Sequence, residues 1–146
     1  MPGERSRERP LVLVVEDNPH DWEIYGKILW YNGFDVLYAA DGTEGLRLSL
    51  EHAPDLVLLD VGLPDMTGLE LCAELRGHAG SAAIPVVVLS ARPRAEYEPR
   101  ALRAGCTQYM EKPAGPLDVL KEVERLIGRP PRSGDGRPPQ LGGCAA

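Results

Sequence analysis

The chain has 146 residues, 43% of them hydrophobic, and a formal net charge of −6. This length is typical of one globular domain, and the hydrophobic content excludes a chain that is disordered throughout. The acidic balance excludes a basic field over the molecule, so we expect no direct binding to nucleic acid.

Two terminal segments are predicted to lie outside the fold. Residues 1–9 are polar and carry several charges, and residues 129–146 are rich in Pro and Gly with little to bury. Such compositions do not offset the entropy that is lost on ordering. We therefore expect a flexible N-terminal segment, one domain at residues 10–128, and a disordered C-terminal tail.

Short apolar runs alternate with helical patterns along residues 10–128. The apolar runs are predicted as strands at Leu11–Val15, Phe34–Ala39, Leu56–Leu59, Val86–Leu89 and Thr107–Met110. Several of them are apolar at every position, which is typical of strands that are buried on both faces.

Helical signals separate these strands. Asn18 can cap a helix that begins at Pro19, runs to about Tyr31 and stops at Asn32-Gly33. Apolar spacing predicts three further helices, over 43–52, 68–77 and 116–127. Their apolar faces contain Leu46 and Leu50, Leu71 and Leu75, and a stripe of Leu117, Leu120, Val123 and Ile127 that we expect to be buried.

Pro99 lies where a fourth helix should already be under way. A proline costs about 3 kcal/mol or more inside a helix but is favourable in the first turn. We therefore expect this helix to begin late, near Glu98, and Arg92–Tyr97 to be loop.

Strand and helix alternate five times, which predicts an α/β fold with a doubly wound, five-stranded parallel sheet. In the flavodoxin-like order 2-1-3-4-5, strands one and three are neighbours. Ligands of such sheets bind at the carboxyl ends of the strands, so the residues that follow each strand are the candidates for a functional site.

Three carboxylates follow two neighbouring strands of this predicted sheet. Glu16 and Asp17 come after strand one, and Asp60 comes after strand three. Each pair of like charges ~5 Å apart costs about 3 kcal/mol at an effective dielectric of ~20, so a raised pKa or a cation is needed. Oxygen ligands at an open edge suit Mg²⁺, and we predict that these acids bind it.

Two further polar residues follow strands four and five, Ser90 and Lys112. Beside a metal ion, the carboxylate of Asp60 is a plausible nucleophile toward phosphorus, giving an aspartyl phosphate. Lys112 would spread the charge on the phosphoryl oxygens, and the Ser90 hydroxyl would donate a hydrogen bond to one of them.

The order and strand positions of these residues resemble those of a bacterial response regulator receiver domain, over about residues 10–128. The matching motifs are VVEDN, LLDVGLPDMTG, LSA and EKP, which contain Glu16-Asp17, Asp60, Ser90 and Lys112. The resemblance implies that Asp60 accepts the phosphoryl group. It also implies that Asp17, Asp60 and the backbone carbonyl of Gly62 bind Mg²⁺ directly, and that Glu16 acts through a water.

The resemblance further implies a cis peptide bond at Lys112-Pro113 and a switch formed by Ser90 and Tyr109. In the family, the hydroxyl moves toward the phosphate and the aromatic ring turns inward, which changes the face of helix four, strand five and helix five. The expected phosphoryl donor is a sensor histidine kinase or a histidine phosphotransfer protein that docks around Asn18–Trp22. We expect a stand-alone receiver that signals to a partner protein and is not an enzyme, with homodimers possible through the same face.

Two alternative functions fit parts of this pattern. A magnesium-dependent phosphatase also forms an aspartyl phosphate, but such enzymes usually carry Asp-x-Asp after the first strand, where this chain has Glu16-Asp17-Asn18. A non-catalytic, flavodoxin-shaped binding module is disfavoured by the complete acidic pocket. Flavin binding is disfavoured too, because no phosphate-binding loop follows strand one.

The cysteines and the start of the chain favour a cytoplasmic protein. Cys72, Cys106 and Cys144 are odd in number and widely spaced, so neither a disulfide framework nor a zinc site is expected. The charged start lacks the apolar segment of a signal peptide, and no apolar run reaches the ~18 residues of a membrane helix.

Overall fold

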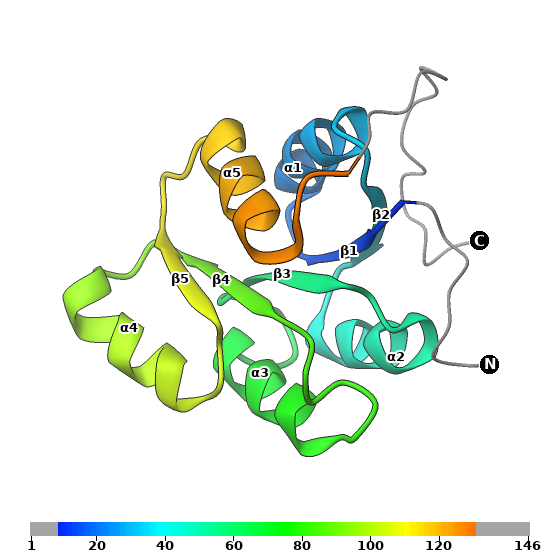
Figure 1. Cartoon of the computed structure of the whole chain (residues 1–146). Helices are drawn as coiled ribbons and strands as arrows, with labels where there is room; N and C mark the ends of the chain where they lie inside the picture. Colours follow the sequence, from blue (N-terminus) through cyan, green and yellow to red (C-terminus); the bar gives the residue numbers. More distant parts are fainter. Residues whose placement is uncertain (1–8, 131–146) are drawn as a thin grey trace.

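The structure of the protein is a computed structural model that describes residues 9–130. Along the described residues, strands and helices alternate (Figure 1). They are β1 (Leu11–Val15), α1 (Pro19–Tyr31), β2 (Asp35–Ala39), α2 (Gly42–His52), β3 (Leu56–Asp60), α3 (Gly68–Gly77), β4 (Val86–Ser90), α4 (Arg94–Arg103), β5 (Gln108–Glu111) and α5 (Pro116–Ile127). Residues 1–8 and 131–146, which hold most of the predicted flexible segments and Cys144, lie outside the described residues.

The strands form one parallel sheet in the predicted order β2-β1-β3-β4-β5. In the register of this sheet, Val15 pairs with Leu59 between β1 and β3, and Asp60 pairs with Leu89 between β3 and β4. The carboxyl ends of the three central strands therefore meet at one edge, which brings together the polar residues that follow them.

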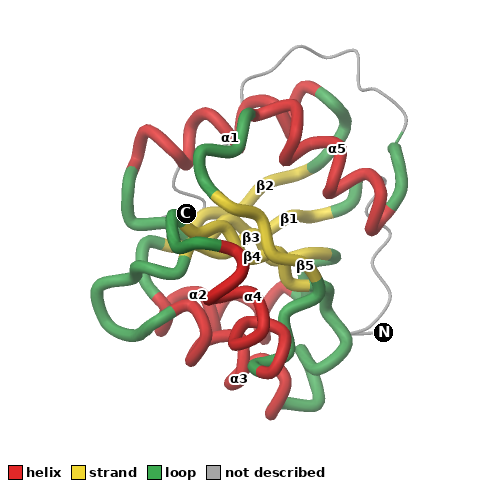
Figure 2. Tube along the Cα trace, turned by 90° about the vertical axis from the view of Figure 1, so that its left-hand side faces the viewer, coloured by secondary structure: helices red, strands yellow, loops and turns green. Residues whose placement is uncertain are grey.

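Helices cover both faces of the sheet. α1 and α5 lie on one face, and α2, α3 and α4 lie on the other (Figures 1 and 2). Because neighbouring residues of a strand point to opposite faces, Leu13 and Val15 of β1 belong to the core on the α2–α4 side, while Val12 and Val14 belong to the core on the α1–α5 side. This explains why β1 is apolar at every position.

Local caps fix the ends of the helices. The side chain of Asn18 accepts a hydrogen bond from the His20 amide at 2.9 Å, and Pro19 begins α1 as predicted. The Asp65 carboxylate, from the segment between β3 and α3, accepts hydrogen bonds from the amides of Gly42 and Thr43 at 2.8 and 2.9 Å. Asp65 therefore ties the segment that follows Asp60 to the start of α2.

The prediction for α4 was wrong. The helix begins at Arg94, four residues earlier than expected, and Pro99 lies inside it. In an uninterrupted helix the amide of residue 99 would donate to the Ala95 carbonyl, but proline has no amide hydrogen to donate. Pro99 and Ala95 are both exposed, so water can satisfy the Ala95 carbonyl. Contacts from another element also support the first turn, because Glu111 of β5 accepts a hydrogen bond from the Arg94 amide at 3.2 Å.

Two leucines of the predicted apolar faces are exposed. Leu117 is 60% exposed and Leu50 is 43% exposed. In α5 the buried stripe is formed by Val119, Leu120 and Val123, and Leu117 lies on the neighbouring side of the helix in its first turn. Spacing by four was correct for Leu71 and Leu75 of α3, which are both 0% exposed, but it did not identify which leucines of α2 and α5 face the sheet.

None of the helices within residues 9–130 has the length and hydropathy that are needed to cross a bilayer.

Candidate functional site

The three predicted acids lie together at the carboxyl edge of the sheet. Carboxylate oxygens of Glu16, Asp17 and Asp60 are all within 4.8 Å of one another. Glu16 is buried, Asp60 is partly buried, and Asp17 is exposed. The neighbouring positions of β1 and β3 cause this convergence, because each strand delivers its last residues to the same edge.

Lys112, which follows β5, reaches into this acidic cluster. Its Nζ lies 3.0 Å from Oδ1 of Asp60 and 3.5 Å from Oε1 of Glu16. The Lys112-Pro113 peptide bond is cis, as the family resemblance implies. The Lys112 amide also donates to the Ser90 carbonyl at 2.7 Å, which holds the start of this loop against β4.

Burial and like charge act together on Glu16. The pKa of Glu16 is raised to about 7, first by burial and then by the charge of Asp60, while Lys112 partly opposes both. Burial lowers the pKa of Lys112, but its hydrogen bond to Asp60 and the charges of Asp60, Glu16 and Asp21 raise the pKa overall. The single positive charge of Lys112 therefore does not neutralise the combined negative charge of Asp60, Glu16 and Asp21, which surround it.

The donor set fits a hard divalent cation. Three carboxylates at an edge of the sheet offer oxygen ligands, and their charge exceeds that of Lys112. Gly62 lies two residues beyond Asp60, and its amide donates to Asp60 Oδ2 at 3.2 Å. The backbone of Gly62 therefore lies beside the same carboxylate.

Two contacts hold the end of β1 in place. The Asn18 amide donates to Oε2 of Glu16 at 3.2 Å, and the indole N–H of Trp22 donates to the backbone carbonyl of Glu16. Trp22 also packs on Tyr38 of β2, with ring centroids 5.4 Å apart. Helix α1 thus fixes Glu16 through both its side chain and its backbone.

Ser90 and Tyr109, the predicted switch pair, are both buried and are linked through one loop residue. Ser90 Oγ accepts a hydrogen bond from the Arg92 amide at 3.0 Å. The Tyr109 hydroxyl donates to the Arg92 carbonyl at 2.6 Å, and the side chain of Tyr109 is 0% exposed. The ring therefore points inward in this structure, against Tyr97 of α4.

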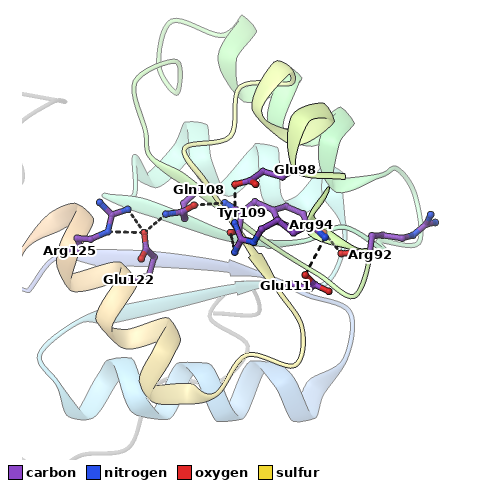
Figure 3. Close-up of polar contacts among 8 residues, drawn as sticks. All are labelled: Arg92, Arg94, Glu98, Gln108, Tyr109, Glu111, Glu122 and Arg125. Carbon is purple, nitrogen blue, oxygen red and sulfur yellow. Dashed lines mark hydrogen bonds and ion pairs between the residues drawn. The ribbon is translucent and has the colours of Figure 1, made fainter. Parts of the chain in front are cut away.

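Arg94 connects the start of α4 to β5 (Figure 3). Its guanidinium donates to the Tyr109 carbonyl at 3.0 Å and forms an ion pair with Glu98 at 2.9 Å. Together with the bond from its amide to Glu111, these contacts fix the loop that carries Arg92. The inward position of Tyr109 is thus supported from α4 as well as from the loop.

A pocket of about 460 Å³ adjoins Lys112. It lies between α1, the β4–α4 loop and the β5–α5 loop, and its wall consists of Asp21, Ile24, Tyr25, Ala91, Lys112, Pro113, Ala114 and Pro116. Most of this wall is apolar, so the pocket offers a partner an apolar contact directly beside the acidic cluster.

A sequence model of the response regulator receiver domain matches residues 12–124. The chain belongs to this family. Receiver domains are signalling domains of two-component phosphorelays rather than classical enzymes, and the family generally binds Mg²⁺ at an acidic pocket.

Named relatives agree with this assignment. Over 119 residues, the chain is 39% identical to the transcriptional regulatory protein KdpE of Mycobacterium tuberculosis, covering 82% of this chain and 51% of KdpE. It thus spans about half the length of that relative. It is 30% identical to the polar-differentiation response regulator DivK of Brucella anthropi, covering 80% of this chain and 95% of DivK.

A solved structure supports the fold of this receiver domain. The receiver domain of the sensor histidine kinase PA1611 from Pseudomonas aeruginosa superposes with a TM-score of 0.75 at 28% identity, covering 82% of this chain and 98% of that one. That structure holds a magnesium ion coordinated in its active-site cleft.

Sequence reasoning did not identify Asp21 as part of the site. Its Oδ2 lies 3.6 Å from Nζ of Lys112, so Lys112 contacts a third carboxylate. An acidic residue in the first turn of a helix is common, because it interacts favourably with the helix dipole. The one available signal was that this first turn follows the strand that carries Glu16 and Asp17.

Proposed function

We propose that this receiver domain accepts a phosphoryl group on Asp60, with Mg²⁺ bound by Asp17, Asp60 and the backbone carbonyl of Gly62, and with Glu16 acting through a water. The observation that carries the proposal is the cluster of three carboxylates within 4.8 Å, with Lys112 3.0 Å from Asp60. The magnesium ion in the cleft of the PA1611 receiver domain supports the choice of metal.

The proposed reaction is transfer from a phosphohistidine. A carboxylate oxygen of Asp60 attacks phosphorus, the new O–P bond forms as the P–N bond breaks, and the imidazole nitrogen keeps the bonding electron pair. When bound, Mg²⁺ would neutralise charge on the phosphoryl oxygens. Lys112, already 3.0 Å from Asp60, would donate to one of these oxygens, and the Ser90 hydroxyl would donate to another.

The proposed donor is a sensor histidine kinase or a histidine phosphotransfer protein. It would dock around Asn18–Trp22, where α1 meets the loops of the site. The pocket beside Lys112 supports this placement, because it presents Ile24, Tyr25 and Pro116 next to the residue that would contact the phosphoryl group. An apolar contact of this kind would exclude water during the transfer.

The proposed output is a change at α4, β5 and α5. A phosphoryl group on Asp60 would draw the Ser90 hydroxyl toward itself and release the Arg92 amide, which now donates to Ser90. The same Arg92 accepts from Tyr109, so the loop and the ring would respond together. We propose that the receiver domain, in the cytoplasm, passes this change to a partner protein, or to a second copy through the same face.

Phosphorylation of the purified chain tests the proposal. Incubation with Mg²⁺ and acetyl phosphate should add one phosphoryl group by intact-mass analysis, and Asp60→Asn should add none. Labelling that persists in Asp60→Asn would refute Asp60 as the acceptor. Steady turnover of a generic phosphate ester would instead favour a phosphatase.

A further inference from the structure

The ammonium of Lys112 is shared among three carboxylates from three separate segments. Its distances are 3.0 Å to Asp60, 3.5 Å to Glu16 and 3.6 Å to Asp21. Asp60 and Glu16 also belong to the cluster that fits a cation, whereas Asp21 does not. Asp21 therefore acts on the ammonium from outside the set of metal ligands.

Asp21 approaches Lys112 from α1. It lies in the first turn of that helix, and its side chain is 31% exposed, compared with 5% for Glu16 and 14% for Asp60. Asp21 and Lys112 are the two charged residues in the wall of the 460 Å³ pocket. A charge pair at an apolar wall is less screened than one in open water, so it interacts more strongly.

On the basis of the proposed function, we propose that Asp21 is a positioning residue for Lys112. The ammonium has three N–H donors and one positive charge to distribute among its neighbours. Attraction to Asp21 holds it partly on the α1 side and limits how fully it neutralises Glu16 and Asp60. Those two carboxylates thus keep more of their negative charge for a divalent cation.

A purely structural role for Asp21 makes a different prediction. An acid in the first turn stabilises a helix through its dipole, here beside the cap that Asn18 already provides. Removal of such an acid would lower the free energy of unfolding. Any change in Mg²⁺ affinity would then be the same whether or not residue 112 is a lysine. The dependence on Lys112 is therefore the decisive observation.

A double-mutant cycle on the full chain measures this dependence. Mg²⁺ affinity is determined by calorimetry and by tryptophan fluorescence for the parent, Asp21→Asn, Lys112→Met and the double variant. We expect Asp21→Asn to weaken Mg²⁺ binding about 3- to 10-fold when it is introduced into the parent chain. When it is introduced into the Lys112→Met variant, we expect it to weaken Mg²⁺ binding by less than about 2-fold. Lys112→Gln replaces Lys112→Met if the latter does not fold.

Two matched variants serve as controls. Glu23→Gln removes the same charge from the same helix two residues further on, and we expect it to leave Mg²⁺ affinity unchanged. Asp21→Glu keeps the charge at the open wall of the pocket, and we expect it to retain affinity close to that of the parent.

Each other outcome has one meaning. Equal weakening by Asp21→Asn in both backgrounds would show that Asp21 acts on the cation directly, and no weakening would show that it does not act at all; either result overturns this inference. These results leave the proposed function intact if the parent still binds Mg²⁺ and is labelled on Asp60. A parent that does neither would overturn the proposed function itself.

Discussion

Gly68 begins α3 directly against the backbone of the residue that carries the site. A Cβ atom at this position would lie 2.7 Å from the Asp60 carbonyl oxygen and 2.9 Å from Cα of Val61. Backbone atoms cannot rotate away, so we expect Gly68→Ala to lower the free energy of unfolding by about 1–3 kcal/mol. Because the clash displaces Asp60, it should also weaken Mg²⁺ binding; urea unfolding and calorimetry measure the two effects.

The same helix supplies the control for this substitution. A Cβ atom at Gly77, the last residue of α3, would meet nothing within 4 Å. We expect Gly77→Ala to leave stability unchanged or to raise it by up to about 1 kcal/mol. If Gly68→Ala were as stable as Gly77→Ala, the close approach of α3 to Asp60 would be refuted.

The thiol of Cys106 should be unreactive in the folded protein. The pKa of Cys106 is raised to about 12, mainly by burial and to a smaller extent by the neighbouring Cys72 and Glu98. At pH 8 its thiolate fraction is then roughly a thousandfold below that of an ordinary cysteine, and it grows only as the pH rises toward 12. Alkylation with iodoacetamide and peptide mass mapping should show slow modification of Cys106 until urea unfolds the chain. Rapid modification under native conditions would contradict this burial.

Residue identity revealed most of the candidate site before the fold was known. Charged residues at or close to the carboxyl ends of strands, such as Asp17, Asp60 and Lys112, have little use in packing, so their positions pointed to chemistry. Asp21 escaped notice as a partner of Lys112 because an acid in a first turn has an ordinary role within a helix, and Trp22 was expected only in the docking segment Asn18–Trp22. Their contacts with Lys112 and Glu16 depend on how α1 lies across the sheet edge, which no local pattern encodes.

At the scale of one element, α4 carries a proline that its surroundings tolerate. Pro99 removes one helical hydrogen bond on the exposed side of the helix. We expect Pro99→Ala to raise the free energy of unfolding by about 1–2 kcal/mol, less than the full helix cost because proline also restrains the unfolded chain. Urea unfolding measures the change, and slower amide exchange should be confined to α4.

Pro116 is the matched control for Pro99. It begins α5, where a proline has no hydrogen bond to lose. We expect Pro116→Ala to give no gain in stability. A gain at Pro116 equal to that at Pro99 would show that the position inside α4 is not the cause.

The start of α4 could not be predicted from its own residues. Its anchors come from elsewhere in the chain, since Glu111 bonds the Arg94 amide and the Tyr109 carbonyl bonds the Arg94 guanidinium. By contrast, α1 begins and ends where expected, because Asn18, Pro19 and Asn32 carry its signals locally. Local caps are visible in a sequence, whereas caps supplied by a neighbouring strand are not.

At the scale of the whole molecule, a bound cation should stabilise the fold. Three carboxylates that repel one another in the metal-free protein lie at the proposed Mg²⁺ site, where Asp17 and Asp60 would bind the ion directly and Glu16 would act through a water. Because Mg²⁺ binds the native state, a concentration of 100 times Kd should add about 2.7 kcal/mol to the free energy of unfolding. Thermal unfolding in Mg²⁺ and in EDTA measures the difference. Asp17→Asn should abolish most of the shift, and an equal shift in that variant would place the ion elsewhere.

The sheet was the most predictable part of the molecule. Apolar runs bounded by polar residues located each strand to within one residue, and the alternation with helices implied parallel strands. The failures lie where the orientation of a helix decides the outcome. Leu117 and Leu50 have the right spacing for a buried face, but both are exposed because the helices turn other residues toward the sheet.

The two apolar clusters on opposite faces of the sheet give the molecule two separately adjustable sides. Residues that pack α1 and α5 are distinct from those that pack α2, α3 and α4. If the phosphoryl donor docks on α1 as proposed, substitutions that adapt α1 to a new donor need not disturb the packing beneath α4. Helix α5 shares its cluster with α1, so within the proposed output face it is α4 that can keep its packing while the donor contact changes.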